Sequence, residues 1–188
     1  MKQNIFVLCL MLIVGCSQQP CPIHGSAKPG TLQYTLNPKK NRTDIPFKYL
    51  NITVTDFLAL PDDSIGDGTA YCMTGGYVIK VKRMNAESCN CKNPDEVDYH
   101  IVVVPSPDDE NDISKHVVVE VTPRLRKQLH WKESEIKHLE HHWVDFFGYK
   151  FADLEHQDMS TKSNPTNKKC WRGTINEIHP VTAWLVVN

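Results

Sequence analysis

The chain has 188 residues and a nearly even charge balance, with 21 basic against 22 acidic side chains and a formal net charge of −1. Such a chain lacks the positive field that holds nucleic acid without sequence preference, so nucleic acid is not an expected partner. The length suits one domain with its own hydrophobic core, but not two.

The N-terminal segment has the residue order of a signal peptide. Lys2 is followed by an apolar run from Ile5 to Val14, which is shorter than the ~20 residues that a membrane-spanning helix needs. The run ends in Ile13-Val14-Gly15-Cys16, where a small residue stands directly before a cysteine. This tetrapeptide resembles the lipobox of bacterial lipoproteins.

The resemblance implies that residues 1–15 are a signal peptide and that Cys16 becomes the lipidated first residue, carrying fatty acids of the palmitate type. The protein would then be anchored in the cell envelope. Because Ser17 replaces the aspartate of an inner-membrane retention signal, the outer membrane is favoured. The alternative is an exported protein with an ordinary thiol at Cys16. The expected partners are the membrane, through the anchor, and an envelope protein or a small ligand.

Residues 16–46 are predicted to be a lipidated tether, because they are rich in small and polar residues and show no sustained apolar period. Only Leu32–Leu36 alternates briefly and could add an edge strand. The predicted globular domain is residues 47–188.

The first half of this domain shows the period-two alternation of strands. An accessory strand is predicted at 49–55, followed by strands at 71–84, 97–104 and 116–122. The dipeptide Gly75-Gly76 predicts a bend in the first long strand.

The second half begins with a helix, because Thr122-Pro123 combines a favoured N-cap with a favoured first helical residue. The helix is predicted to extend to about residue 142. Strands follow at 143–151, with a curl at Gly148, and at 174–187. Four aromatic residues share one face of the 143–151 strand and are predicted to pack inside the fold: Trp143, Phe147, Tyr149 and Phe151.

Three strands, a helix and two strands are the order of elements in an OB-fold, a five-stranded Greek-key barrel. Residues ~70–188 resemble that fold in the order of their elements rather than in a diagnostic motif. The predicted class is therefore mainly β, an OB-like barrel with one helical segment between strands three and four and an N-terminal accessory strand. An unrelated small α+β domain or a sandwich is the alternative.

The resemblance also implies a disulfide from Cys170 to either Cys89 or Cys91, because the two loops that carry them flank one groove in an OB-fold. A competing hypothesis is a metal site formed by these three cysteines and a histidine. Paired cysteines in zinc sites are usually separated by two to four residues, whereas only one separates Cys89 from Cys91. No metal or cofactor is therefore expected.

Polar residues inside strands are the candidates for chemistry, since they either face water or have a partner. In OB topology His100, Glu120, Glu177 and His179 would converge on one side of the sheet, with Arg124 nearby in the first turn of the helix. The histidines and glutamates could serve as acid and base in a phosphodiesterase- or nuclease-like hydrolase, and Arg124 and Arg172 could clamp a phosphate or carboxylate of its substrate. The competing interpretation is a solvated face stabilised by cross-strand ion pairs.

A groove is predicted beside the loop at residues 157–170, bordered by Glu155, His156, Trp171 and Arg172. With no matched catalytic motif, the leading hypothesis is an envelope lipoprotein that binds a ligand or a partner protein in this groove. A hydrolase is the first alternative, and a metal-binding or redox module is the second.

Overall fold

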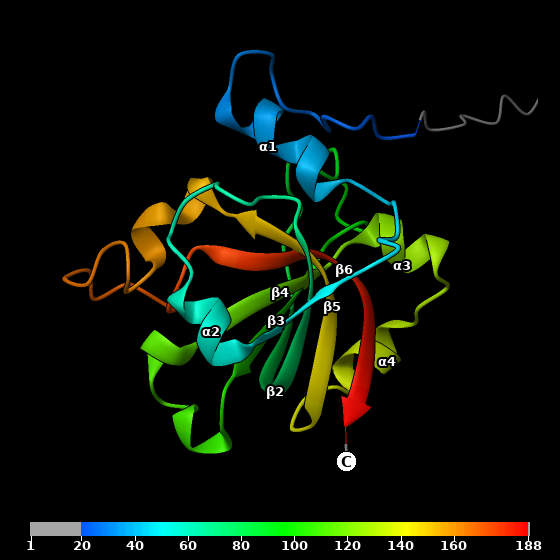
Figure 1. The fold of residues 1–188 in the computed structure, drawn as a ribbon. Coiled ribbons are helices and arrows are strands. Elements are labelled where there is room, and N and C mark those ends of the chain that lie inside the picture. Colours follow the sequence, from blue (N-terminus) through cyan, green and yellow to red (C-terminus); the bar gives the residue numbers. More distant parts are fainter. Residues whose placement is uncertain (1–19, 188) are drawn as a thin grey trace, which may run out of the picture.

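The computed structural model describes residues 20–187 (Figure 1). The predicted signal peptide, the lipidation site Cys16 and the first residues of the predicted tether lie outside this range. Among the described residues, no helix has the length and apolar character needed to cross a bilayer.

The described chain is mainly β. Its helices and strands are α1 (Leu32–Lys40), β1 (Leu50–Thr53), α2 (Val54–Ala59), β2 (Ala70–Arg83), β3 (Tyr99–Val104), β4 (Val117–Val121), α3 (Pro123–Gln128), α4 (Glu133–Lys137), β5 (Trp143–Ala152) and β6 (Asn176–Val187). Short 3₁₀ turns lie at Pro107–Asp109, Ile113–Lys115 and Leu154–Met159.

Five strands close into a barrel. β2 pairs antiparallel with β3 and with β5, while β3 pairs with β4 and β5 with β6 in the same sense. The barrel is completed by a parallel pairing of β4 with β6. This is the strand order of an OB-like barrel, with α3 and α4 between its third and fourth strands, so the predicted fold class is confirmed. The accessory strand β1 pairs in parallel with the first half of β2.

Two glycine positions let the strands curve around the barrel. The pairing of β2 with β5 shifts register between Met73 and Gly76, and Gly75 has a φ of 63°. The pairing of β5 with β6 shifts at Gly148, where a side chain would overlap the backbone of Pro180. Both bends lie where the glycines predicted them.

The barrel interior is filled by aliphatic and aromatic side chains from alternate strand positions. On β5 the inward residues are Val144 and Phe146, which belong to the central apolar cluster. The prediction that the opposite face of this strand packs inside the barrel is therefore wrong. Trp143 on that face is 38% exposed, and Tyr149 and Phe151 are buried by another part of the chain.

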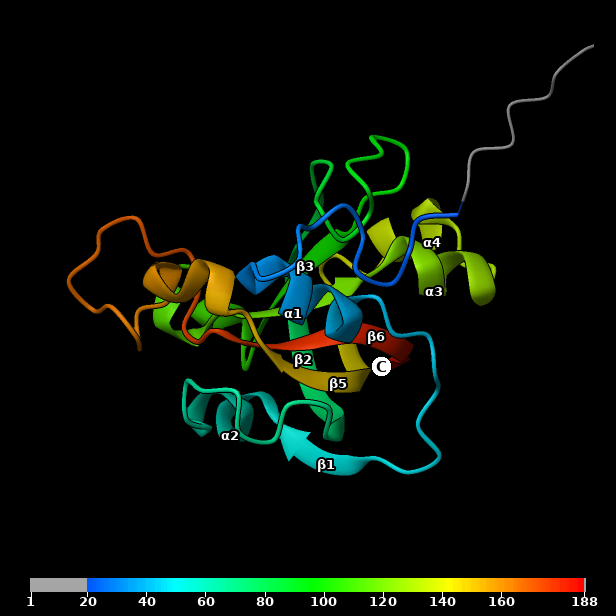
Figure 2. The ribbon, with the colours of Figure 1, turned by 90° about the horizontal axis from the view of Figure 1, so that it is seen from above.

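That other part is the segment 20–46, for which the prediction of a tether is wrong. It contains α1, which is capped by the Thr31 hydroxyl and lies across one end of the barrel in Figures 1 and 2. The predicted edge strand at Leu32–Leu36 is part of this helix. Leu36 is buried, the Lys40 ammonium lies 5.7 Å from the Phe151 ring centre, and Arg42 stacks on Tyr149.

The same segment determines the disulfide. Cys91 is bonded to Cys21, so the predicted bond from Cys170 to Cys89 or Cys91 is wrong. Among the described cysteines, Cys72, Cys89 and Cys170 are free and buried. Cys21 becomes the partner because residues 20–46 fold back onto the barrel instead of extending away from it.

Candidate functional site

Four of the predicted site residues converge on the outer face of the barrel. His100 on β3 and Glu120 on β4 are paired in register, and the His100 Nε2 lies 2.7 Å from the Glu120 Oε1. The other Glu120 oxygen lies 3.1 Å from the Nδ1 of His179 on β6, which is 3.3 Å from Glu177 Oε2. The alternation of β3 places His100 opposite the inward-facing Ile101, so the cluster is separate from the apolar core.

Burial governs the protonation of this cluster. The side chains of Glu177 and His179 are 1% and 0% exposed, and only His100, at 11%, approaches the surface. Burial raises the pKa of Glu120 well above its usual value and lowers the pKa of His100. Burial also disfavours the charged form of His179, but the two glutamates offset this and raise its pKa. Burial therefore favours the protonated form of Glu120, whereas the neighbouring glutamates favour the protonated form of His179.

Arg172 lies behind this cluster and is fully buried. Its guanidinium donates to Glu177 and, over 2.9 Å, to Asp153 Oδ2. The prediction that Arg172 borders a groove and clamps a ligand is therefore wrong, because its charge is already used by two internal carboxylates. Glu155, another predicted groove residue, forms an ion pair of 3.1 Å with Lys40 of α1.

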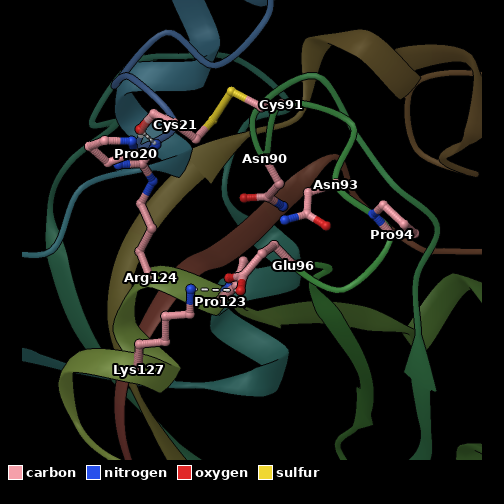
Figure 3. Close-up of a pocket in the computed structure, with 10 residues that line it drawn as sticks. All are labelled: Pro20, Cys21, Asn90, Cys91, Asn93, Pro94, Glu96, Pro123, Arg124 and Lys127. Atoms are coloured by element: carbon pink, nitrogen blue, oxygen red, sulfur yellow. Dashed lines mark hydrogen bonds and ion pairs between the residues drawn. A yellow bond between two sulfur atoms is a disulfide. The ribbon is translucent and has the colours of Figure 1, made fainter. Parts of the chain in front are cut away.

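Arg124 lies outside the cluster, contrary to the prediction. One guanidinium nitrogen, Nη2, donates to the backbone carbonyls of Cys21 and Pro22 at 2.7 Å each, so Arg124 holds the N-terminal segment in place. It lines a separate hollow of about 670 Å³ beside the Cys21–Cys91 bond. Figure 3 draws Arg124 with the other residues that line this hollow. We call this the disulfide hollow. Two of its lining residues, Lys127 and Glu96, form an ion pair of 2.6 Å.

A second hollow, of about 550 Å³, lies on the outer face of β2 and β3. We call it the β2–β3 groove. Its charged and polar lining residues are Lys80, Lys82, Glu87, His100, His116, His156, Cys170 and Trp171, and its apolar ones are Ile79, Met84, Val102 and Ile113. Of the four predicted groove residues, His156 and Trp171 line it. The ring of Trp171 stacks near that of His100, with centres 6.1 Å apart and planes inclined by 23°.

The sequence interpretation missed the two lysines of the groove. Lys80 and Lys82 lie on the polar side of β2, and Lys82 pairs in register with His100. Their alternation with Ile79 and Val81 was the available signal. It indicated an exposed strand face but did not show that loops from two other parts of the chain enclose that face.

The β2–β3 groove is the better candidate site of the two hollows, although the disulfide hollow is larger. In the disulfide hollow, Arg124 is bonded to backbone carbonyls and Lys127 is paired with Glu96. In the groove, the described part of the chain shows no ion pair for Lys80 or Lys82, so their charges are open to a ligand.

Comparison of the chain with protein-family models, curated proteins and solved structures found no match. The geometry of the β2–β3 groove is therefore the basis for inferring the function of the chain.

The Asp153 carboxylate makes stability depend on pH. Burial alone would raise its pKa, but its bond to His156 and the charges of Lys40 and Arg172 hold the pKa well below its usual value. A carboxylate with a lowered pKa stabilises the fold above its unfolded value of about 3.9, and this contribution is lost as the pH falls. In urea titrations, the free energy of unfolding of the native chain should fall below about pH 4. In Asp153→Asn this fall should be smaller, and parallel pH profiles for the two chains would contradict the assignment.

Proposed function

We propose that the chain is a lipid-anchored cell-envelope protein whose OB-like barrel binds a small anionic ligand with an apolar part. The ligand occupies the β2–β3 groove. The observation that carries this proposal is the groove lining, where two lysines and three histidines stand beside apolar side chains and Trp171.

The disulfide supports the envelope location. Bonds such as Cys21–Cys91 persist in oxidising compartments and are rare in the bacterial cytoplasm. The four residue steps from Cys16 to Pro20 span at most about 14 Å, so lipidation at Cys16 would hold the folded part close to the membrane surface. The outer membrane remains the favoured location because of Ser17.

The chemistry of the groove favours an anion. Lys80 and Lys82 are exposed on neighbouring outward positions of β2, and Glu87 is the acidic residue among the lining side chains. A phosphate, sulfonate or carboxylate between the lysines would gain charge-assisted hydrogen bonds. Val102 and Trp171 would contact an apolar or aromatic part of the same ligand.

The alternative, a hydrolase, is supported by one feature, which is the pairing of His100 with Glu120 at the edge of the groove. An acid/base mechanism that uses all four clustered residues needs them to reach the substrate. Glu120, Glu177 and His179 are buried and do not line the groove. Ligand binding needs only the lining residues, and it is therefore the function we propose.

A matched pair of dyes tests the binding function. Anilinonaphthalene sulfonate carries an anion on an aromatic body, and N-phenylnaphthylamine is its uncharged counterpart. In fluorescence titrations we expect the double variant Lys80→Gln, Lys82→Gln to bind the sulfonate about tenfold more weakly, a loss of about 1.4 kcal/mol. Its affinity for the uncharged dye should stay unchanged, because the apolar contacts remain.

The control for this titration is Lys132→Gln, Lys137→Gln, which removes two exposed lysines at α4 without touching the groove. It should bind both dyes like the native chain. Equal sulfonate affinity in the two double variants would contradict an anion site at β2.

The anchor requires its own test. Replacing Cys16 by alanine should abolish incorporation of labelled palmitate and move the protein from the membrane fraction to the soluble fraction, because the lipid has no other predicted attachment point. Cys9→Ala is the matched control, since Cys9 lies within the predicted signal peptide. Labelled palmitate retained in the Cys16 variant would exclude a lipoprotein anchored there.

A further inference from the structure

A second group of chemically reactive side chains lies beside the groove, in the connection between β2 and β3. Glu87 and Cys89 belong to this loop, and Asp98 directly precedes β3. The Cys89 Sγ lies 3.7 Å from Glu87 Oε2 and 3.8 Å from Asp98 Oδ2. One ligand atom from each of the three residues lies within 4.8 Å of the others.

Asp98 is incompletely satisfied within this group. It is 1% exposed, and its Oδ2 accepts a hydrogen bond of 3.2 Å from the Asn90 side chain. Its other oxygen, Oδ1, is buried and has no hydrogen-bond partner in the described chain. Leaving a buried carboxylate oxygen unpaired costs about 1–3 kcal/mol, so such an atom calls for a partner that the chain itself does not provide.

The charged side chains around Asp98 also favour an added cation. Four carboxylates are buried in this part of the barrel, with Glu87 and Glu155 half-buried beside them: Asp98, Glu120, Asp153 and Glu177. The basic groups that contact these carboxyl groups in the described chain are Lys40, His100, His156, Arg172 and His179. None of these five groups forms an ion pair with Asp98 in the described chain, so an added cation would meet an acidic group that lacks one.

We propose that Glu87, Cys89 and Asp98 bind one divalent metal ion of the zinc class. A tetrahedral zinc ion with bonds of about 2.3 Å to sulfur and 2.0 Å to oxygen has sulfur–oxygen edges of roughly 3.5 Å, close to the two separations observed. The combination of a thiolate with carboxylates suits zinc better than calcium or magnesium, which prefer oxygen ligands alone.

A metal ion can reach this site from solvent, and the nearby Lys40 ammonium is compatible with its binding. Glu87 lines the β2–β3 groove, so an ion can reach the buried Cys89 and Asp98 from solvent through that side chain. The Lys40 ammonium lies 3.7 Å from Glu87 but only 3.1 Å from Glu155. Lys40 can therefore keep its ion pair with Glu155 when a metal ion binds the Glu87 carboxylate.

This ligand set differs from the metal site considered in the sequence. Cys91 is committed to the disulfide with Cys21, and Cys170 contacts carbonyl groups of its own loop. Only Cys89 of the three cysteines lies among acidic side chains. The proposal does not depend on the proposed ligand of the groove.

Cobalt is the probe for this site, because Co²⁺ bound to a cysteine thiolate has a sulfur-to-metal charge-transfer absorption that oxygen-bound Co²⁺ lacks. The full chain, purified in detergent and stripped with a chelator, is titrated with Co²⁺ and then with Zn²⁺. We expect the absorption band to appear at one equivalent of Co²⁺ and to disappear when Zn²⁺ displaces it.

Two variants locate the site. Cys89→Ser should lose the absorption band, while Cys170→Ser, which replaces a buried free cysteine outside the group, should retain it. Glu87→Gln changes a half-buried residue, so it should fold and bind Co²⁺ at least tenfold more weakly. No band in the folded native chain, or native Co²⁺ affinity in Glu87→Gln, would overturn the proposal.

Discussion

Replacing Arg172 by methionine is expected to lower the free energy of unfolding by about 3–5 kcal/mol. The side chain is fully buried and bonds to both Asp153 and Glu177. Methionine fills similar space but leaves the two carboxylates buried without their cation, and an unpaired buried charge is costly. The loss should be visible in urea or thermal unfolding of the purified chain.

The control for this variant is Lys127→Met. Lys127 also pairs with a carboxylate, at 2.6 Å, but its side chain is largely exposed. Because exposed ion pairs contribute about 0–1 kcal/mol, this variant should unfold almost like the native chain. Equal losses in the two variants would show that burial of Arg172 is not what makes it important.

Breaking the disulfide is expected to cost about 4 kcal/mol in the chain-entropy model, because the bond joins residues 70 positions apart. Cys21→Ser and Cys91→Ser should therefore destabilise the chain similarly. The effect should be concentrated in the N-terminal segment, since residues 20–46 would lose their covalent link to the barrel. Relative to the native chain, hydrogen exchange in these variants should accelerate more in α1 than in β3.

Cys72→Ala is the comparison for the disulfide variants, because Cys72 is a buried free cysteine. It should not accelerate exchange in α1. Reducing agent should reproduce the effect of Cys21→Ser in the native chain and add nothing to that variant. If α1 exchanges at the same slow rate with and without the bond, noncovalent packing alone would hold the segment on the barrel.

The barrel was predictable because its signals are local. Period-two alternation identified the strands, and the glycines at 75–76 and 148 marked the places where β2 and β5 bend. The convergence of His100 with Glu120 and His179 followed from the strand order, since neighbouring strands in a known topology place outward residues side by side. Pattern and topology were sufficient for these features.

The N-terminal segment was not predictable in the same way. Apart from Leu36, α1 buries mainly the polar residues Asn37 and Lys40, so it shows no apolar stripe. Lys40 is buried because carboxylates of the barrel surround it, which is a tertiary contact that no local pattern reveals. Because the sequence did not show that residues 20–46 cover β5, the outer face of this strand looked like an inner one. For the same reason, the sequence did not show that Arg124 bonds to backbone carbonyls of this segment.

Arg172 and the acidic residues around Cys89 could not be placed from the sequence either, because their surroundings also depend on tertiary contacts. The position of Arg172 just before β6 favoured an exposed clamp, whereas the loop at 153–172 folds over the barrel and buries it. Glu87, Cys89 and Asp98 are spread over twelve residues with no known ligand spacing. Their proximity depends on how one irregular loop returns to β3.

A crystal structure of the chain with anilinonaphthalene sulfonate bound distinguishes the β2–β3 groove from the disulfide hollow as the anion site, because the two hollows offer the dye different cations. We expect the sulfonate between Lys80 and Lys82, with the aromatic rings against Trp171 in the β2–β3 groove. Dye bound instead in the disulfide hollow, beside Arg124 and Lys127, would contradict the proposed site.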